Sequence, residues 1–311
     1  MPSEIPPTPL LQRGEHPCPT GDIKSRATAA YLGMAIGDAF GATVEFMTPR
    51  EIAAHYGRHD RIVGGGWLRL KPGQVTDDTT MALALGESIL ASGGVFAGAA
   101  ARAFDAWMRA KPVDIGSTVR RGLLNFRKSG ATEVDYSEHD AGNGAAMRVL
   151  PVALAMLGQS EAAVRSACRA QAHITHHNAL SDAATETLAL MVQAALRGSD
   201  TVRLLHDYAH PLAAQHPEFT FRAVRQRQNP SGYVVETLQA VFQAFFDTDD
   251  FESCLIDVVN RGGDADTTGA IAGMLAGAVY GLDALPARWL NGLDPDVRSA
   301  CARQAEALIA M

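Results

Sequence analysis

Apolar residues recur at helical spacing through most of the chain from Lys24 onward. Segments rich in Ala, Leu and Met place these residues three and four positions apart, which gathers them on one side of a helix. The clearest predicted helices cover residues 79–90, 147–157, 161–172, 180–196, 234–246 and 297–310. Because runs of alternating β-branched residues are nearly absent, the pattern predicts an all-α protein.

Local signals add a short helix and one exception to the helical pattern. In Thr48-Pro49-Arg50-Glu51 a capping hydroxyl, a proline at the first helical position and a glutamate three residues after the cap predict a helix start, which Gly57 then ends. Residues 61–74 contain three successive glycines and a Lys-Pro-Gly turn, so a loop or a small hairpin is expected there.

Two predicted helices carry glycine at every fourth position, which places the glycines on one helical face. The first has Gly33, Gly37 and Gly41, and the second has Gly269, Gly273, Gly277 and Gly281. Glycine costs a helix about 1 kcal/mol relative to alanine, so a close backbone approach is the expected compensation. We predict that both helices are central and pack closely, which would bring the polar residues at their ends together.

The chain is expected to form one domain preceded by a leader. Six of the fifteen prolines fall in the first nineteen residues, so residues 1–22 are predicted to be a flexible leader and residues 23–311 a single compact domain. Neither a basic start followed by an apolar core nor an internal linker is visible. The longest apolar tract, between Asp266 and Asp283, has sixteen uncharged residues, short of the roughly 20 that span a membrane, so no membrane insertion is expected.

The composition and charge limit the kinds of partner that this protein is expected to bind. The 311 residues are 47% hydrophobic and 20% charged, with a net charge of −7, which argues against nucleic acid as the main partner. The four cysteines, Cys18, Cys168, Cys254 and Cys301, are far apart in the sequence, so neither disulfides nor a thiolate metal site is indicated and a cytoplasmic location is expected.

Acidic residues and threonines gather at three turns beside helix ends. The first cluster contains Asp38 and Glu45; the second is Thr76-Asp77-Asp78-Thr79-Thr80; the third is Asp264-Ala265-Asp266-Thr267-Thr268. One acidic residue at each helix start is explained by capping, but pairs of repelling carboxylates exceed that need. The pattern alone leaves capping and metal binding both open. Such oxygen ligands suit Mg²⁺ or Mn²⁺ better than Zn²⁺, and Asp264 and Asp266 point the same way only if their segment is extended.

Four motifs in order resemble those of the ADP-ribosylglycohydrolases, over about Lys24 to Leu290. They are G-D-A-F-G-A-T-V-E (37–45), T-D-D-T-T-M (76–81), G-N-G-A-A-M-R (142–148) and G-G-D-A-D-T-T (262–268). The resemblance implies an all-α fold with a central cleft for two divalent cations, Mn²⁺ or Mg²⁺, which binds ADP-ribose and cleaves its N-glycosidic bond to a protein arginine. The implied metal ligands are Thr76, Asp77, Asp78, Asp264, Asp266 and Thr267.

The same resemblance implies catalytic roles for Glu45 and Asp114. Asp114 is expected to contact the arginine guanidinium or to accept a proton during ribose ring opening, and Glu45 to position water or to gate the site. Direct attack by water and a ring-opened intermediate are both compatible with these residues.

The remaining expected contacts are to ADP-ribose. The segment Gly142-Asn143-Gly144-Ala145 leads into a predicted helix whose N-terminus suits the diphosphate, although without the other motifs a simple capping turn would explain it. By resemblance, Tyr233 stacks on the adenine and His176 contacts ADP-ribose. His173 and His177 share a helical face but have no evident third ligand, so a zinc site is not predicted there.

The predicted function is removal of ADP-ribose from a modified protein arginine. Within this family the expected protein substrate is dinitrogenase reductase, with a PII-type signalling protein as the implied regulatory partner. Two alternatives remain: the same reaction on another protein, for example as immunity to a toxin, and a non-catalytic ADP-ribose-binding or structural relative. Residues 1–22 have no counterpart in the family pattern, and Ala265 stands where threonine is common.

Overall fold

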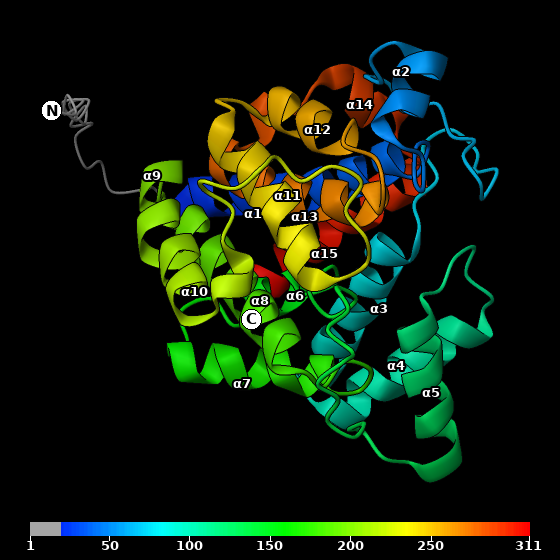
Figure 1. The fold of residues 1–311 in the computed structure, drawn as a ribbon. Coiled ribbons are helices and arrows are strands. Elements are labelled where there is room, and N and C mark those ends of the chain that lie inside the picture. Colours follow the sequence, from blue (N-terminus) through cyan, green and yellow to red (C-terminus); the bar gives the residue numbers. More distant parts are fainter. Residues whose placement is uncertain (1–19) are drawn as a thin grey trace, which may run out of the picture.

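Two long helices, α1 (Thr20–Gly41) and α13 (Ala265–Tyr280), run antiparallel through the middle of the protein in the computed structural model, which describes residues 20–311 (Figure 1). All side chains from Ala27 to Glu45 and from Ala265 to Ala278 are buried. A helix that is covered on all sides has no need of a polar face, which explains the apolar composition of both. Residues 1–19, most of the predicted leader, lie outside the described part, and α1 already begins at Thr20.

Shorter helices surround this central pair. In the N-terminal half they are α2 (Pro49–Tyr56), α3 (Asp77–Ser92), α4 (Ala97–Arg109), α5 (Ser117–Ser129), α6 (Leu150–Ala155) and α7 (Glu161–Ala172). In the C-terminal half they are α8 (Ala179–Leu196), α9 (Thr201–Leu204), a π-helical turn (Leu205–Ala209), α10 (His210–Gln215), a 3₁₀ turn (Pro217–Phe219), α11 (Val234–Asp247), α12 (Phe251–Val259), a 3₁₀ turn (Leu282–Ala284), α14 (Ala287–Gly292) and α15 (Pro295–Ile309). Residues 20–311 contain two isolated β-bridges and no β-strand, so the predicted all-α fold is confirmed.

The glycine faces of α1 and α13 meet, as predicted. A methyl group built on Gly37 would lie 1.9 Å from the carbonyl oxygen of Gly269, and one on Gly33 would lie 2.3 Å from that of Gly273. Only glycine permits this backbone approach, which offsets its intrinsic cost in a helix. Gly281 does not belong to this face: it caps the end of α13 with a φ of 80° and has open space around its Cα.

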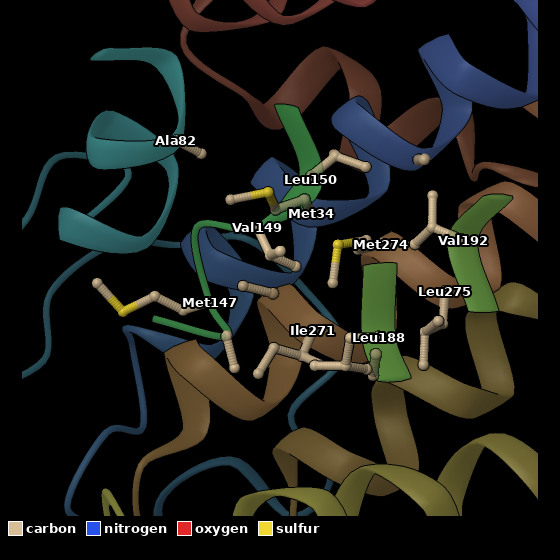
Figure 2. Close-up of a cluster of buried hydrophobic side chains, with 14 of the residues drawn as sticks. Met34, Ala82, Met147, Val149, Leu150, Leu188, Val192, Ile271, Met274 and Leu275 are labelled. Atoms are coloured by element: carbon tan, nitrogen blue, oxygen red, sulfur yellow. The ribbon is translucent and has the colours of Figure 1, made fainter. Parts of the chain in front are cut away.

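The remaining core forms where α3, α6 and α8 pack against the central pair. Figure 2 shows Met34 of α1 and Met274 of α13 among apolar side chains that include Leu150 and Leu188. α15 packs on α1 and α3, and α11 and α12 pack on α13. This packing holds the C-terminal end of α1 against the N-terminal end of α13.

Most predicted elements occur with shifts of a few residues, and one differs more. The capping box at Thr48 and Glu51 is present, and Gly57 ends α2. The loop at 61–74 is closed by a single bridge between Gly65 and Leu70. The helix predicted for 147–157 is only α6, Leu150–Ala155, because the bridge from Gly142 to Tyr233 and the bond from the Asn143 N–H to the Gly232 carbonyl, at 3.0 Å, hold the preceding segment in turns.

A search of residues 20–311 for a helix that is both long and apolar enough to cross a bilayer finds none.

Candidate metal centre and active site

A pocket of about 400 Å³ opens where the end of α1 meets the starts of α3 and α13. This volume falls in the range of small-molecule binding sites. Most of the residues expected to form the site line it together: Glu45, Asp77, Asp114, Gly142, Asn143, Gly144, His176, Asp264, Asp266 and Thr267. Side chains that are far apart in the sequence therefore share one cavity.

The close helix pair is what brings the first and third acidic clusters together. A methyl group on Gly41 would lie 2.1 Å from the Ala265 carbonyl oxygen, so the two helix ends touch. Just beyond, the Phe46 N–H donates to the Gly263 carbonyl at 2.7 Å. Glu45 is thereby held opposite the turn that carries Asp264.

A buried carboxylate of α1 shapes the turn that carries the second cluster. One oxygen of Asp38 accepts bonds from the backbone N–H and the hydroxyl of Thr76, both at 2.9 Å. The other accepts from the N–H of Thr79 at 3.0 Å and from its hydroxyl at 2.5 Å. Asp38 thus caps α3 from a distant element, since the side chain of Thr76, its own N-cap residue, makes no capping bond. The sequence motif contains Asp38, but capping from 38 residues away was not foreseen.

Four of the six predicted ligands, Thr76, Asp78, Asp266 and Thr267, form one buried group at the pocket. The Thr76 hydroxyl lies 3.2 Å from Asp78 Oδ2 and 3.3 Å from Asp266 Oδ2, and the Thr267 hydroxyl lies 3.3 Å from Asp78 Oδ2. Asp78 Oδ1 is also buried, yet among residues 20–311 it has no hydrogen-bond partner. A buried acceptor without a donor costs free energy unless a ligand satisfies it. These oxygens, from carboxylates and hydroxyls alone, fit a hard divalent cation.

Burial changes the proton affinity of these acids. It raises the pKa of Asp77 to about 7, with the charge of Asp114 adding to the effect. Burial also raises the pKa of Asp78, of Asp264 and of Asp266, and for Asp78 and Asp266 the neighbouring carboxylates add to this effect. Such acids bind protons readily, and a divalent cation would take the place of those protons. Their chemistry therefore agrees with a metal centre.

A second group of acids faces the pocket itself. Glu45, Asp114 and Asp266 each place a carboxylate oxygen within 4.8 Å of the others, as ligands around one cation do. Asp114 is half-buried, and its Oδ1 accepts the Ile115 N–H at 2.8 Å. Burial raises the pKa of Asp114 as well.

Trp67, from the glycine-rich loop, orients Glu45. Its indole N–H donates to Glu45 Oε2 at 2.6 Å. The loop reaches this position because Gly66, with a φ of 65°, packs so closely on the chain that a methyl group would lie 2.4 Å from the Ala42 carbonyl oxygen. Burial raises the pKa of Glu45 to about 8, although the bond from Trp67 opposes the rise. The sequence analysis missed Trp67; its only signal was a tryptophan directly after three glycines.

The third acidic cluster differs from the expected extended segment. Asp264 is the N-cap residue of α13, and Asp266 lies in its first turn. Asp264 and Asp266 still line the same pocket. Asn143 holds the first of them by donating from Nδ2 to Asp264 Oδ2 at 2.6 Å and to the Thr237 hydroxyl at 2.9 Å.

The expected diphosphate segment also has a different form. The Asn143 N–H already donates to the Gly232 carbonyl at 3.0 Å, and the helix begins only at Leu150. The segment 142–145 is therefore not a helix N-terminus. Gly142 and Gly144 still line the pocket, whereas Ala145 is buried and does not; its carbonyl accepts from Gln171 at 3.1 Å.

Of the two remaining predicted contacts, one lines the pocket and the other does not. His176 is 2% exposed and lines the pocket. Tyr233 is 40% exposed and does not line it, although it precedes α11 and forms a bridge to Gly142. Its ring is therefore at the surface beside the pocket wall.

Glu133 lies beside the histidine pair His173 and His177, which the sequence did not predict. Glu133, His173 and His177 form a second group with metal-ligand spacing, and the two rings stack with centroids 3.9 Å apart. His177 Nδ1, however, lies 2.9 Å from the Val134 carbonyl, so that nitrogen carries a proton. His173 Nε2 lies 2.9 Å from Asp182 Oδ2. These contacts describe an ion-pair cluster.

Comparison with known proteins identifies the class. The family model described as ADP-ribosylglycohydrolase matches residues 19–311, so this chain belongs to the ADP-ribosylglycohydrolase family, as its four motifs indicated. It is 51% identical to the ADP-ribosyl-[dinitrogen reductase] glycohydrolase of Rhodospirillum rubrum over 289 residues, 93% of this chain and 97% of that protein.

Two less similar proteins have names that agree with this family. The chain is 32% identical to an ADP-ribosylarginine hydrolase of Serratia proteamaculans (strain 568), over 89% of this chain and 78% of that one. A solved structure titled "ADP-ribosylglycohydrolase-related protein complex" superposes with a TM-score of 0.81 at 36% identity, covering 94% of this chain and 99% of the other.

Proposed function

We propose that this protein is a metal-dependent hydrolase that removes ADP-ribose from a modified protein arginine, with dinitrogenase reductase as its substrate. The observation that carries the proposal is the convergence of Glu45, Asp77, Asp114, Asp264 and Asp266 on one pocket of about 400 Å³. A helical scaffold gains no stability from gathering these repelling carboxylates, so their convergence points to a bound ligand.

The proposed ligands of two divalent cations are the oxygens of Thr76, Asp77, Asp78, Asp264, Asp266 and Thr267. The unpartnered Asp78 Oδ1 and the raised pKa values of the buried aspartates support this assignment. When bound, Mn²⁺ or Mg²⁺ would neutralise the carboxylates and bind hydroxyl oxygens of the ribose. Two further residues hold these ligands in place. Asn143 bonds to Asp264, and Asp38 fixes the Thr76 backbone.

Asp114 is proposed to bind the guanidinium of the modified arginine. It is half-buried at the pocket wall, next to Glu45 and Asp266, and its free oxygen can accept N–H donors while Oδ1 is held by Ile115. A carboxylate and a guanidinium form a strong, charge-assisted pair. This contact would keep the leaving nitrogen beside the anomeric carbon.

Glu45 is proposed to accept the proton of the attacking water. The water oxygen forms the new bond to the anomeric carbon, the carbon–nitrogen bond breaks, and its electron pair leaves with the guanidine nitrogen. The water proton passes to the carboxylate of Glu45, which the Trp67 N–H holds in place at 2.6 Å. The raised pKa of Glu45, about 8, makes its carboxylate a stronger base than an exposed glutamate, and the rate should rise with pH as the carboxylate forms.

The choice of dinitrogenase reductase rests on the 51% identity to the Rhodospirillum rubrum enzyme. A second candidate is another ADP-ribosylated protein, because the Serratia ADP-ribosylarginine hydrolase is also similar over most of the chain. Both candidate substrates would present the same modified arginine to the pocket and would differ in the protein surface that docks beside it.

One experiment separates these functions. ADP-ribose release is measured from ADP-ribosylated dinitrogenase reductase and from an unrelated arginine-modified protein, with Mn²⁺ and with a chelator, for the wild type, Asp264→Ala and the exposed control Asp283→Ala. We expect metal-dependent release, faster from dinitrogenase reductase, that is lost in Asp264→Ala and kept in Asp283→Ala. Equal rates would favour a broader hydrolase, and no release from either substrate would favour a non-catalytic binding protein.

The proposal also includes a regulatory partner and a cellular location for this protein. By family resemblance, a PII-type signalling protein is the proposed regulatory partner, and the cytoplasm is the proposed location. Cys168, Cys254 and Cys301 are buried free thiols, which agrees with a reducing compartment. Co-purification of the tagged chain with a PII-type protein from the soluble fraction would support both, and its absence under all nitrogen conditions would contradict the partner.

A further inference from the structure

A charged side chain is buried behind the pocket without a carboxylate bonded to it. Arg148 is fully buried, with its guanidinium carbon 4.4 Å from the centre of the Phe104 ring. Its Nε donates to Gln171 Oε1 at 2.7 Å, and its Nη2 donates to the Gln171 carbonyl at 2.9 Å and to the Thr175 hydroxyl at 2.8 Å. Burying a charge costs free energy, so a buried arginine held by such specific contacts indicates a functional role.

The Thr175 hydroxyl links Arg148 to His176, which lines the pocket. A hydroxyl has one proton, and the oxygen of Thr175 already accepts from Arg148, so its proton is available for one acceptor. That acceptor is Nδ1 of His176, 2.8 Å away. Because Nδ1 accepts, the proton of a neutral His176 must be on Nε2.

The opposite tautomer is disfavoured by the same count of donors and acceptors. With a proton on Nδ1, the Thr175 oxygen would receive two donors, and its own proton would have no acceptor among the contacts of residues 20–311. An unpaired buried donor costs free energy, so the Nε2–H form is favoured.

Nε2 of His176 faces the part of the pocket that two glycines leave open. A methyl group on Gly142 would lie 2.9 Å from this nitrogen, and one on Gly144 would lie 3.0 Å from it. Within residues 20–311 Nε2 has no hydrogen-bond partner, although His176 is only 2% exposed. Because His176 lines the pocket, Nε2 is available to bond a ligand there.

We propose that Arg148 and Thr175 are positioning residues that fix His176 in its Nε2–H tautomer, so that the imidazole donates to an oxygen of bound ADP-ribose. The identity of that ligand rests on the function proposed above; the tautomer does not. The donated hydrogen selects an acceptor oxygen and disfavours a hydroxyl proton or an amino group at this point of the pocket.

Burial, together with the charge of Arg148, also keeps the ring neutral. Burial, with Arg148 and Arg121 adding to its effect, lowers the pKa of His176 to about 3. Burial lowers the pKa of Arg148 to about 9, so the guanidinium stays charged at neutral pH. The imidazole is therefore a neutral donor throughout the working range.

The tautomer can be observed directly by long-range ¹H–¹⁵N NMR of the imidazole in the full chain without substrate. The His176 signal is assigned by its absence in His176→Asn. Thr175→Val replaces the hydroxyl by a methyl group, and Thr175→Ser is the matched control that keeps the hydroxyl. Affinity for ADP-ribose itself is measured in parallel by calorimetry with Mn²⁺, and the melting temperature reports on folding.

We expect pure Nε2–H His176 in the wild type and in Thr175→Ser, and a mixture of tautomers in Thr175→Val. ADP-ribose affinity should fall about tenfold in Thr175→Val and stay within about twofold of wild type in Thr175→Ser. A purely structural role would lower the melting temperature and leave the tautomer unchanged.

Three results would overturn the proposal: a wild-type His176 with its proton on Nδ1, a Thr175→Val variant with unchanged tautomer, or a changed tautomer with unchanged ADP-ribose affinity. The wild-type spectrum alone decides the first, even if Thr175→Val fails to fold. An inactive protein with the expected tautomer and affinity would refute the hydrolase function and leave this inference standing.

Discussion

Asp38 accepts hydrogen bonds from both the backbone N–H and the hydroxyl of Thr76, each at 2.9 Å. The carboxylate belongs to the end of α1, whereas Thr76 begins the turn that carries Asp77 and Asp78. The central helix therefore positions the acids of the candidate metal centre through a side chain that we do not count among the ligands.

Asp38→Asn should loosen that turn. The amide keeps the size of the carboxylate, but its NH₂ group replaces one of the two acceptor oxygens and faces the donors of either Thr76 or Thr79, so we expect the free energy of unfolding to fall by about 1–3 kcal/mol. Mn²⁺ affinity should fall about 10- to 100-fold, as for other residues that orient ligands. Denaturant unfolding and metal titration test both, with exposed Asp283→Asn as the control; unchanged metal affinity would remove Asp38 from the site.

Metal should stabilise the protein more at high pH than at low pH. The folded-state pKa values of Asp77 (about 7), Asp78 and Asp266 are raised, so the folded metal-free protein holds more protons than the unfolded chain above about pH 4. Its stability should therefore fall as pH rises from about 4 through about 7. A cation replaces those protons and removes the penalty.

Melting curves at pH 5.5 and pH 8, with Mn²⁺ and with a chelator, measure this effect. At pH 8 and a Mn²⁺ concentration 100 times the dissociation constant, we expect about 2.7 kcal/mol of stabilisation. At pH 5.5 the same concentration should give a smaller shift, and Asp264→Ala should respond less at both. An equal shift at both pH values would show that the buried acids are not the metal ligands.

Trp67→Phe should change catalysis more than stability. Trp67 is 53% exposed, so loss of its indole costs little folding energy, but the charged form of Glu45 loses its donor. The pKa of Glu45 should rise further, and the acidic limb of the pH–rate profile should move upward by about one pH unit. Rates at pH 6 to 9 with saturating Mn²⁺ check the shift; a parallel drop at every pH would assign Trp67 a different role.

His173 should give the protein a pH-dependent stability that its glutamine variant lacks. Burial lowers the pKa of His173, but the hydrogen bond and charge of Asp182, together with Glu133, outweigh it and raise the pKa. A raised histidine pKa adds stability that is complete below the unfolded value, about 6.5, and is lost as pH rises through the folded value.

The difference in free energy of unfolding between wild type and His173→Gln isolates this contribution. It should decrease between pH 6 and pH 8 and be smaller at high salt, because the pair is partly exposed. A difference that does not vary with pH would mean that the His173–Asp182 contact is a neutral hydrogen bond.

Gly37→Ala should disrupt the central helix pair. The new methyl group would overlap the Gly269 carbonyl oxygen, 1.9 Å away, and backbone atoms cannot yield as a flexible side chain can. We expect a loss of at least about 3 kcal/mol of stability. Gly98→Ala is the matched control in α4, where the nearest atom is the end of Arg102 at 3.5 Å, and should raise stability by up to about 1 kcal/mol. Equal effects would refute the close-contact explanation.

Most of the helices and most of the candidate site residues could be predicted from the sequence. Helical periodicity, the capping box at Thr48 and Glu51, and the glycine spacing act over three or four residues, and such local signals depend little on the rest of the chain. The prediction failed where local signals were overridden: residues 147–149 have helical composition, yet bonds to Asn143 and Gly232 hold the preceding segment in turns, and the helix starts at Leu150.

Only the tertiary structure decided how the acids are supported. Asp38 and Thr76, Trp67 and Glu45, and Asn143 and Asp264 are bonded pairs separated by 38, 22 and 121 residues, and no periodic pattern links such positions. The bond from Arg148 to Thr175 is also non-local, whereas Thr175 and His176 are neighbours in the sequence. The sequence by itself determined the helices and which residues carry the chemistry, because both depend on short-range spacing and residue type; packing decided their partners, geometry and proton affinity, because these depend on which distant groups share a buried space.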